Sequence, residues 1–235
     1  MEKPIVFVTE VGSCYRPYHY KVRGLERHPS HYYSARGKVT HRALEMALLG
    51  KEPSWDYRLF FPEGTPGVHG DDLGLPPEMF EKCLGEARAA YGKGRRWFSD
   101  TSLIKQGEKI WVEEEFKKDM GDFILCGHPD LMTKTAIFDF KSGKKRVTDD
   151  HRWQLTGYEI LTGRKETYLV FLGEEKAIEV EVPKSDRDAI LNTYIREAQK
   201  AADWKRRAAS GEIPPAQVGF GCVWCPYVGR YCQGV

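Results

Sequence analysis

The chain has 235 residues, of which 41% are apolar and 30% are charged, and its formal net charge is +2. This composition is that of a globular domain with one sizeable core, and it excludes binding of nucleic acid through bulk positive charge. No run of apolar residues is long enough to cross a membrane, and the first residues lack an export signal, so we expect one cytoplasmic domain over residues 1–235 without a membrane partner.

The N-terminal part, residues 1–109, is predicted to be mainly helical. Apolar residues recur at helical spacing over residues 34–50, with Gly50 as a stop, and this helix carries His41. Residues 51–76 are rich in glycine and proline and predict a loop. A second helix is predicted over residues 76–92, beginning at proline.

Residues 110–184 are predicted to form the core sheet, because the apolar period changes from that of helices to that of strands. The predicted strands are residues 109–117, 122–132, 135–141, 166–173 and 176–183.

Two further helices are predicted in this half of the chain. One covers residues 149–161, capped by Asp149 or Asp150, and one covers residues 185–210, capped by Ser185. The final part, residues 185–235, adds a cysteine-rich segment. Together the elements predict an α/β domain with a mixed sheet flanked by helices.

Two carboxylates are predicted to meet at one edge of the sheet. Asp130 ends one strand and Asp139 lies near the end of the next, so antiparallel pairing across a turn at Thr133 and Lys134 would bring them face to face. Such oxygens suit Mg²⁺ or Mn²⁺. Lys141, two residues after Asp139, projects from the same face, and a metal with a lysine is suited to cleaving a phosphodiester. An ordinary surface ion pair is the alternative.

Three other side chains are candidates for the same site. His41 offers an imidazole that could complete the metal shell, although a single helical histidine is more often exposed or packed in the core. Gln154 and Tyr158 are four residues apart and share one helix face. They could bind phosphate or support Lys141, or they could only pack on the sheet.

The segments "GKVTH", "GHPDLM", "IFDFKSG" and "QLTGYEIL", in this order, resemble the RecB-like branch of the PD-(D/E)XK nuclease superfamily. The resemblance runs from Cys14 to Cys232 and implies a restriction-endonuclease-like fold. It implies metal binding and catalysis by the following groups: His41, Asp130, Asp139 and the backbone carbonyl of Phe140 as metal ligands, with Lys141, Gln154 and Tyr158 beside them. Relatives often have a further glutamate nearby, but the sequence does not choose among Glu113, Glu114 and Glu115.

Three cysteines crowd together near the C-terminus. Cys222, Cys225 and Cys232 form a three-ligand set that needs a fourth, and no cysteine or histidine lies between Asp203 and Gly221. The remaining candidates are remote: Cys14, Cys83, Cys126 or a histidine. Thiolates suit either zinc or an iron-sulfur cluster.

The segments "GSCYRPYHYKVRG" and "CVWCPYVGRYC" resemble the two ends of an iron-sulfur subset of RecB-like nucleases, which includes CRISPR-associated exonucleases. This resemblance implies a 4Fe-4S cluster held by Cys14, Cys222, Cys225 and Cys232. The last spacing is six residues where many relatives have five, and zinc stays open as the alternative. Cys83 and Cys126 are expected to be buried thiols.

The resemblance implies a divalent-metal-dependent DNA nuclease that degrades single-stranded DNA, with 5′ to 3′ polarity. The basic stretches at 92–97 and 143–146 could hold phosphates, and Trp97 and Trp153 could stack on bases or belong to the core. The expected partners are DNA and proteins of CRISPR spacer acquisition or of recombination, in a cellular or a phage setting. A DNA- or partner-binding module without activity and a zinc-ribbon structural protein are the rivals.

Overall fold

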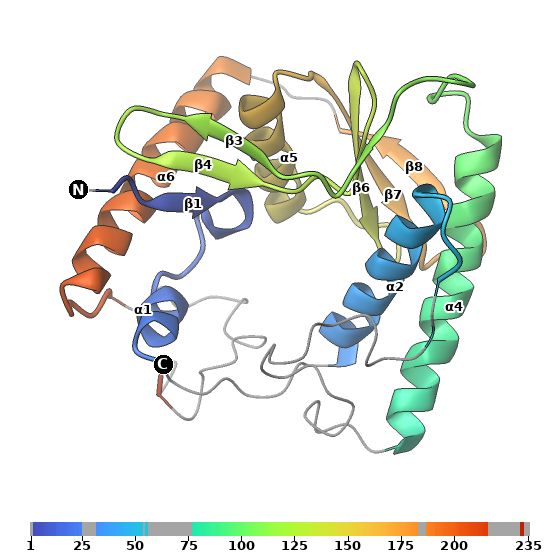
Figure 1. Cartoon of the computed structure of the whole chain (residues 1–235), viewed down its shortest axis with the longest axis horizontal. Helices are drawn as coiled ribbons and strands as arrows, with labels where there is room; N and C mark the ends of the chain where they lie inside the picture. Colours follow the sequence, from blue (N-terminus) through green and yellow to red (C-terminus); the bar gives the residue numbers. More distant parts are fainter. Residues whose placement is uncertain are drawn as a thin grey trace.

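Two β-sheets lie at the centre of the fold, and helices flank them (Figure 1). The computed structural model describes residues 2–24, 32–53, 55, 77–182, 187–215, 231 and 232. The smaller sheet has the order β1-β4-β3 and the larger has the order β2-β5-β6-β7-β8. The architecture is the predicted mixed α/β fold with a helical N-terminal part.

The smaller sheet joins the start of the chain to its middle. It consists of β1 (Ile5–Phe7), β3 (Phe116–Asp119) and β4 (Ile124–Gly127). Strand β1 runs parallel to β4, and β3 runs antiparallel to it. The sequence did not predict β1, because three residues are too few to show a period.

The larger sheet carries the predicted turn. It consists of β2 (Trp111–Val112), β5 (Leu131–Met132), β6 (Ala136–Lys141), β7 (Glu166–Phe171) and β8 (Ile178–Glu181). Strands β5 and β6 are antiparallel, as predicted across Thr133 and Lys134, while β6 and β7 are parallel. A parallel pair requires a crossover, which helix α5 (Asp149–Thr162) supplies.

Two predicted strands are each broken in two. Residues 109–117 divide into β2 and β3 around Glu113, whose φ of 50° lies in the left-handed region and ends the extended backbone. Residues 122–132 divide into β4 and β5 around Pro129, which has no N–H to donate to a ladder. The two breaks move the chain from one sheet to the other.

The helices agree with the predictions in kind and differ at their ends. Helix α2 (Tyr32–Leu48) is the predicted helix that carries His41, and α4 (Pro77–Asp100) runs eight residues beyond its predicted end at 92. A Cβ atom at Gly94 would lie 2.5 Å from Leu44 Cδ2, so this glycine lets α2 and α4 approach closely.

The cap of α5 is Thr148 and not Asp149 or Asp150, because Thr148 Oγ1 accepts a hydrogen bond from the His151 N–H. Helix α6 (Arg187–Ala209) is the predicted last helix, and its predicted cap, Ser185, lies outside the described residues. The short helices η1 (Val8–Glu10) and α1 (Arg16–Val22) were not predicted.

Two apolar clusters stabilise the sheets. One packs helices α5 and α6 against both sheets, and the other packs α2 and α4 against the larger sheet. Trp97 is part of the second cluster, with its ring 5.4 Å from that of Phe138, and it donates to Glu179 at 2.8 Å. Trp97 therefore belongs to the core and does not offer a base-stacking surface.

Helix α1, near the start of the chain, lies beside the described residues 231 and 232 near its end (Figure 1). Arg16 Nε donates to the Pro214 carbonyl at 3.0 Å, and the Tyr20 hydroxyl donates to the Tyr231 carbonyl at 3.0 Å. Lys205 Nζ donates to the Ile5 carbonyl at 2.6 Å. Segments about two hundred residues apart are therefore held together by hydrogen bonds.

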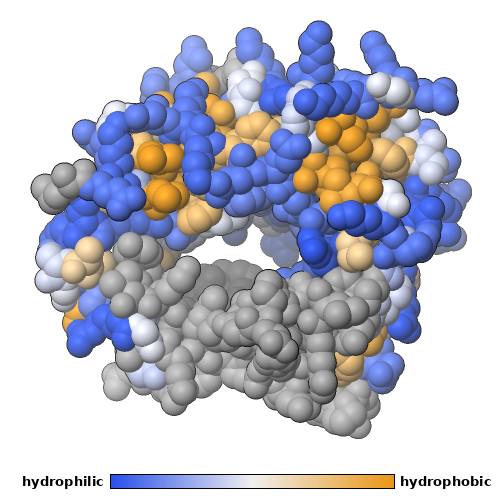
Figure 2. All heavy atoms as spheres, viewed as in Figure 1, coloured by the Kyte–Doolittle hydropathy of each residue, from blue (hydrophilic) through white to orange (hydrophobic). Residues whose placement is uncertain are grey.

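The described residues on the face in Figure 2 are largely hydrophilic, and smaller apolar groups lie among them. Within the described residues, no helix combines the length and the hydropathy that crossing a membrane requires.

Candidate active site

Polar side chains from α2, from the larger sheet and from the residues that adjoin its strands converge at one end of β5 and β6. The residues that form this inner cluster are His41, Glu113, Asp130, Asp139 and Lys141. Four of the five were predicted from the sequence, and Glu113 is the addition.

The two predicted carboxylates stand opposite one another. Leu131 pairs with Phe138 in the antiparallel ladder, so the next residues outward, Asp130 and Asp139, are also opposed. Asp130 Oδ2 accepts the Phe140 N–H at 2.6 Å, and its Oδ1 lies 3.2 Å from His41 Nδ1. The side chain of Asp139 is almost fully buried. The structure thus brings the predicted ligand residues together around two desolvated carboxylates.

Glu113 is the glutamate that the sequence did not select. Its carboxylate, the His41 imidazole and the Asp130 carboxylate offer ligand atoms within 4.8 Å of one another. Its N–H also donates to the Asp130 carbonyl at 3.3 Å. The left-handed backbone at Glu113 sends this side chain into the cluster, whereas Glu115 contacts Cys126 and Lys117 elsewhere. A positive φ at a glutamate is not readable from sequence.

Lys141 begins a chain of hydrogen bonds that leads into α5. Its Nζ lies 2.6 Å from Asp139 Oδ2 and donates to Gln154 Oε1 at 3.0 Å. Gln154 Nε2 donates to the Tyr158 hydroxyl at 3.2 Å, and that hydroxyl donates to the His128 carbonyl at 3.0 Å. Gln154 and Tyr158 therefore hold the lysine in place, and Tyr158 also packs in the core.

The buried charges shift one another's protonation. Burial lowers the pKa of His41, but the charge and hydrogen bond of Asp130 outweigh it and raise that pKa to about 9. Burial raises the pKa of Asp139 against the opposing charge of Lys141. Burial, followed by the charge of Asp130, raises the pKa of Glu113 to about 8. Protons on the inner cluster and the ammonium of Lys141 therefore offset the negative charge of its carboxylates, which would be costly to bury uncompensated.

The ligands present fit a hard divalent cation. Carboxylate oxygens predominate, and one imidazole joins them. Asp139 Oδ2 is buried and has no well-directed hydrogen bond, even though Lys141 Nζ lies at ion-pair distance. A buried acceptor in this state is one that a cation would satisfy. Phe140 brings its backbone to the cluster through its N–H, and its carbonyl as a ligand stays a prediction.

The predicted iron-sulfur ligands are only partly described. Cys222 and Cys225 lie outside the described residues. Cys14 is partly exposed and Cys232 is buried, and Cys232 Sγ accepts a hydrogen bond from Arg16 Nη1 at 3.3 Å. The cysteine-bearing segments at the two ends of the chain are thus adjacent, as a shared cluster would require.

The other two thiols are buried, as predicted. Cys83 packs between α2 and α4 in an apolar cluster. Cys126 is fully buried, but its surroundings are not purely apolar, because Sγ donates to Glu115 Oε2 at 3.4 Å.

Comparison with solved structures gives a fold. No family model matches the chain, and no curated protein matches it. The crystal structure of SSO0001 covers 98% of this chain and 88% of its own, with a TM-score of 0.51 and 14% identity. The crystal structure of a proposed exonuclease from Eubacterium rectale covers 96% of this chain and 85% of its own, with a TM-score of 0.56 and 13% identity. The chain has a restriction-endonuclease-like α/β fold. At these identities the likeness extends to the fold and no further.

Proposed function

We propose that this chain is a divalent-metal-dependent DNA nuclease. The observation that carries the proposal is the convergence of three buried or half-buried carboxylates, one imidazole and one lysine at one end of strands β5 and β6. Perturbed protonation of several groups in one place is typical of catalytic sites. The proposed exonuclease from Eubacterium rectale shares the fold.

His41, Asp130, Asp139 and the Phe140 carbonyl would hold Mg²⁺ or Mn²⁺, and Glu113 would join them. The cation supplies a Lewis acid that stabilises negative charge at a phosphodiester. Lys141 carries a fixed positive charge for the phosphate oxygens, because the charges of Asp139 and Asp130 outweigh burial and raise its pKa. Gln154 orients this ammonium, and Tyr158 orients Gln154 in turn.

A hollow that reaches the segment directly after Lys141 would receive the nucleic-acid strand. Its volume is about 860 Å³. It is lined by residues of α2 and α4 and by the loop that follows Lys141, among them Tyr33, Arg36, Lys93, Ser142 and Lys144. Lys93 and Lys144 come from the two basic stretches of the sequence. Cations and an aromatic ring together are the groups that hold the backbone and bases of single-stranded DNA. Arg36 is paired with Glu86, which also lines the hollow, and Lys93 donates to the Leu172 carbonyl, so a bound strand would compete with these contacts.

The finer proposal is a 5′ to 3′ exonuclease on single-stranded DNA that carries a 4Fe-4S cluster on Cys14, Cys222, Cys225 and Cys232. The contacts of Arg16 with Pro214 and Cys232 support it, because they hold the two cysteine-bearing segments together. Such a cluster would tie the ends of the chain by metal-thiolate bonds. We also propose that the protein acts in the cytoplasm, in CRISPR spacer acquisition or in recombination, together with the proteins of that process.

The deciding experiment is digestion of end-labelled single-stranded DNA with Mn²⁺, with Mg²⁺ or with chelator. The proteins are wild type, Asp139→Ala, Lys141→Ala and the control Asp119→Ala, which removes an exposed carboxylate paired with Lys3. We expect metal-dependent cleavage by wild type and Asp119→Ala and none by the other two, with the label position giving polarity. Binding of DNA without cleavage by every protein would favour a binding module instead.

The proposed iron-sulfur cluster has a separate test. Iron and acid-labile sulfide are measured in wild type, Cys222→Ser and Cys83→Ser. We expect both elements in wild type and Cys83→Ser, and their loss together with a lower melting temperature in Cys222→Ser. Zinc in place of iron would overturn the cluster and leave the nuclease proposal standing.

A further inference from the structure

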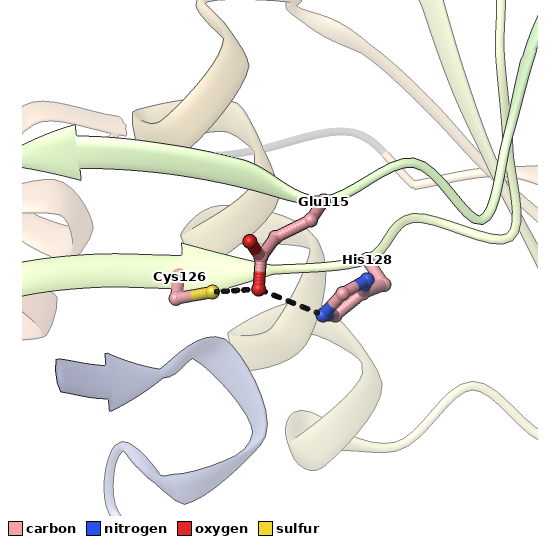
Figure 3. Close-up of side chains that lie close together, drawn as sticks. All are labelled: Glu115, Cys126 and His128. Carbon is pink, nitrogen blue, oxygen red and sulfur yellow. Dashed lines mark hydrogen bonds and ion pairs between the residues drawn. The ribbon is translucent and has the colours of Figure 1, made fainter.

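A second group of metal-ligating side chains lies outside the inner cluster. Figure 3 shows Glu115, Cys126 and His128 pointing toward one another. Cys126 Sγ lies 3.4 Å from Glu115 Oε2, and His128 Nε2 lies 3.6 Å from the same oxygen. All three ligand atoms lie within 4.8 Å of one another. We call these three residues the outer cluster.

The backbone explains why these side chains meet. In the β3–β4 ladder Phe116 pairs with Gly127, so the next residues outward, Glu115 and His128, are opposed. Cys126 is two residues from His128, and residues two apart on a strand share a face. The arrangement therefore rests on strand register and not on the chance rotation of long side chains.

The spacing fits a tetrahedral ion. Zinc lies about 2.3 Å from sulfur and about 2.0–2.1 Å from nitrogen and oxygen, so tetrahedral angles place the ligand atoms about 3.3–3.6 Å apart. The two distances to Glu115 Oε2 are 3.4 and 3.6 Å. The sulfur and the imidazole nitrogen lie within 4.8 Å of one another, and a tetrahedral ion would bring them to about 3.6 Å.

Burial leaves one side of the outer cluster open. The Cys126 thiol is fully buried, whereas the side chains of Glu115 and His128 are 42% and 41% exposed. A cation bound here would have sulfur behind it and solvent in front. Three protein ligands with an open fourth position are the pattern of zinc sites that bind a further ligand.

The neighbouring groups leave the ligand atoms available. Lys117 Nζ pairs with the other Glu115 oxygen, Oε1, at 2.5 Å. The Phe7 ring stacks on the His128 imidazole with centroids 6.5 Å apart, which holds that ring in the cluster. Burial, followed by the Glu115 carboxylate, raises the pKa of Cys126 to about 11, so the free thiol keeps its proton. Binding a cation would release that proton to solvent.

We propose that Glu115, Cys126 and His128 form a second metal site, which takes Zn²⁺ or a cation of the same class and keeps one coordination position open. A set of one sulfur, one nitrogen and one oxygen favours such a cation over Mg²⁺. The outer cluster shares no ligand side chain with the inner cluster, so a variant in one leaves the ligand set of the other intact.

The test uses Co²⁺ as a probe of the full chain, because a thiolate bound to Co²⁺ gives a charge-transfer band and a carboxylate site does not. Wild type is compared with Cys126→Ser, His128→Ala and the control Cys83→Ser, which removes another buried thiol. The C-terminal cysteines are present in every protein, so difference spectra isolate Cys126. We expect one equivalent of the band to vanish in Cys126→Ser, at least about tenfold weaker binding in His128→Ala, and no change in Cys83→Ser.

Equal Co²⁺ stoichiometry and equal spectra in all four proteins would overturn the proposal. If Cys126→Ser does not fold, the test rests on His128→Ala and Glu115→Gln, which change half-exposed side chains and should each weaken Co²⁺ binding. The Asp139→Ala variant, in which nuclease activity should be lost, is expected to keep the Co²⁺ band. Failure of this site and failure of the nuclease proposal are therefore distinguishable.

Discussion

Glu113 and Glu115 are two residues apart, but they belong to clusters that differ in burial and in chemistry. Asp130 and His128, on the segment between β4 and β5, are also two residues apart and also belong to different clusters. The left-handed Glu113 and Pro129 break both segments between the two sheets, so one member of each pair turns inward and the other turns outward. Local backbone breaks, and not residue type, decide which site a side chain joins.

The two clusters also differ in how their charge is compensated. Asp130 is 8% exposed and Asp139 is 1% exposed, and a histidine and a lysine neutralise them. Glu115 is far more exposed and needs only Lys117 beside it. Desolvation makes charge in the inner cluster costly, which explains its dense pairing.

The largest expected effect is at Asp130. Asp130→Asn keeps an acceptor for the Phe140 N–H but removes the charge that holds His41 and a cation. We expect Mn²⁺-dependent cleavage of single-stranded DNA to fall on the order of 10²- to 10³-fold. Initial rates from a gel assay with labelled DNA measure this. Wild-type rates in Asp130→Asn would show that the inner cluster is not catalytic.

Variants of Glu113, Glu114 and Glu115 compare the two clusters most directly. Glu113→Gln is expected to lower the cleavage rate about 10- to 100-fold, because it removes a carboxylate from the inner cluster. Glu115→Gln should instead weaken Co²⁺ binding at the outer cluster. Glu114→Gln, at an exposed position in neither cluster, is the matched control for both assays. The assignment of the clusters would be wrong if Glu113→Gln and Glu114→Gln cleaved DNA equally fast.

Tyr158→Phe tests the hydrogen-bond chain behind Lys141. It removes the hydroxyl that joins Gln154 to the His128 carbonyl, and we expect roughly tenfold slower cleavage. Tyr194→Phe is the control, since it also removes a buried hydroxyl, one that donates to the Val8 carbonyl at 3.2 Å. Both variants should lose about 1 kcal/mol of unfolding free energy, measured with urea. Equal rates in the two variants would leave Tyr158 with a structural role alone.

The last expected effect concerns stability and not cleavage, and it is an acid dependence at His151. Burial, followed by the charge of Lys141, lowers the pKa of His151 from 6.5 to about 4. Between these values the unfolded chain binds a proton that the folded chain does not, so the imidazole makes stability fall as pH drops from 6.5 toward 4. His151→Gln keeps an acceptor for the Thr148 N–H and should lose less stability over this interval. Urea denaturation at both ends of this pH interval measures the free energy of unfolding. Identical losses of stability in wild type and His151→Gln would contradict the lowered pKa.

Several features of the site were readable from local pattern. The turn at Thr133 and Lys134 predicted antiparallel pairing, and this pairing opposes Asp130 and Asp139. The spacing of Gln154 and Tyr158 predicted one helix face, which is the face that contacts Lys141. These predictions succeeded because strand alternation and helical periodicity act over a few residues.

Other features needed contacts between distant residues. Strand β1 pairs with β4 more than a hundred residues away. Trp97 stood beside arginines in the sequence, and its place in the core follows from the packing of α4 on Phe138. The outer cluster was not predicted, because Cys126 and His128 meet Glu115 only through the β3–β4 register.

By itself the sequence determined the α/β class, most of the helices and strands of the described residues, and the residues of the inner cluster except Glu113. Periodicity, turn residues and local spacing carry that information, since they depend on the backbone within a few residues. Tertiary structure decided which glutamate enters the inner cluster, how the sheet divides in two and where the outer cluster forms. Those outcomes depend on strand register and on a single left-handed residue, and both are set by packing between segments far apart in the chain.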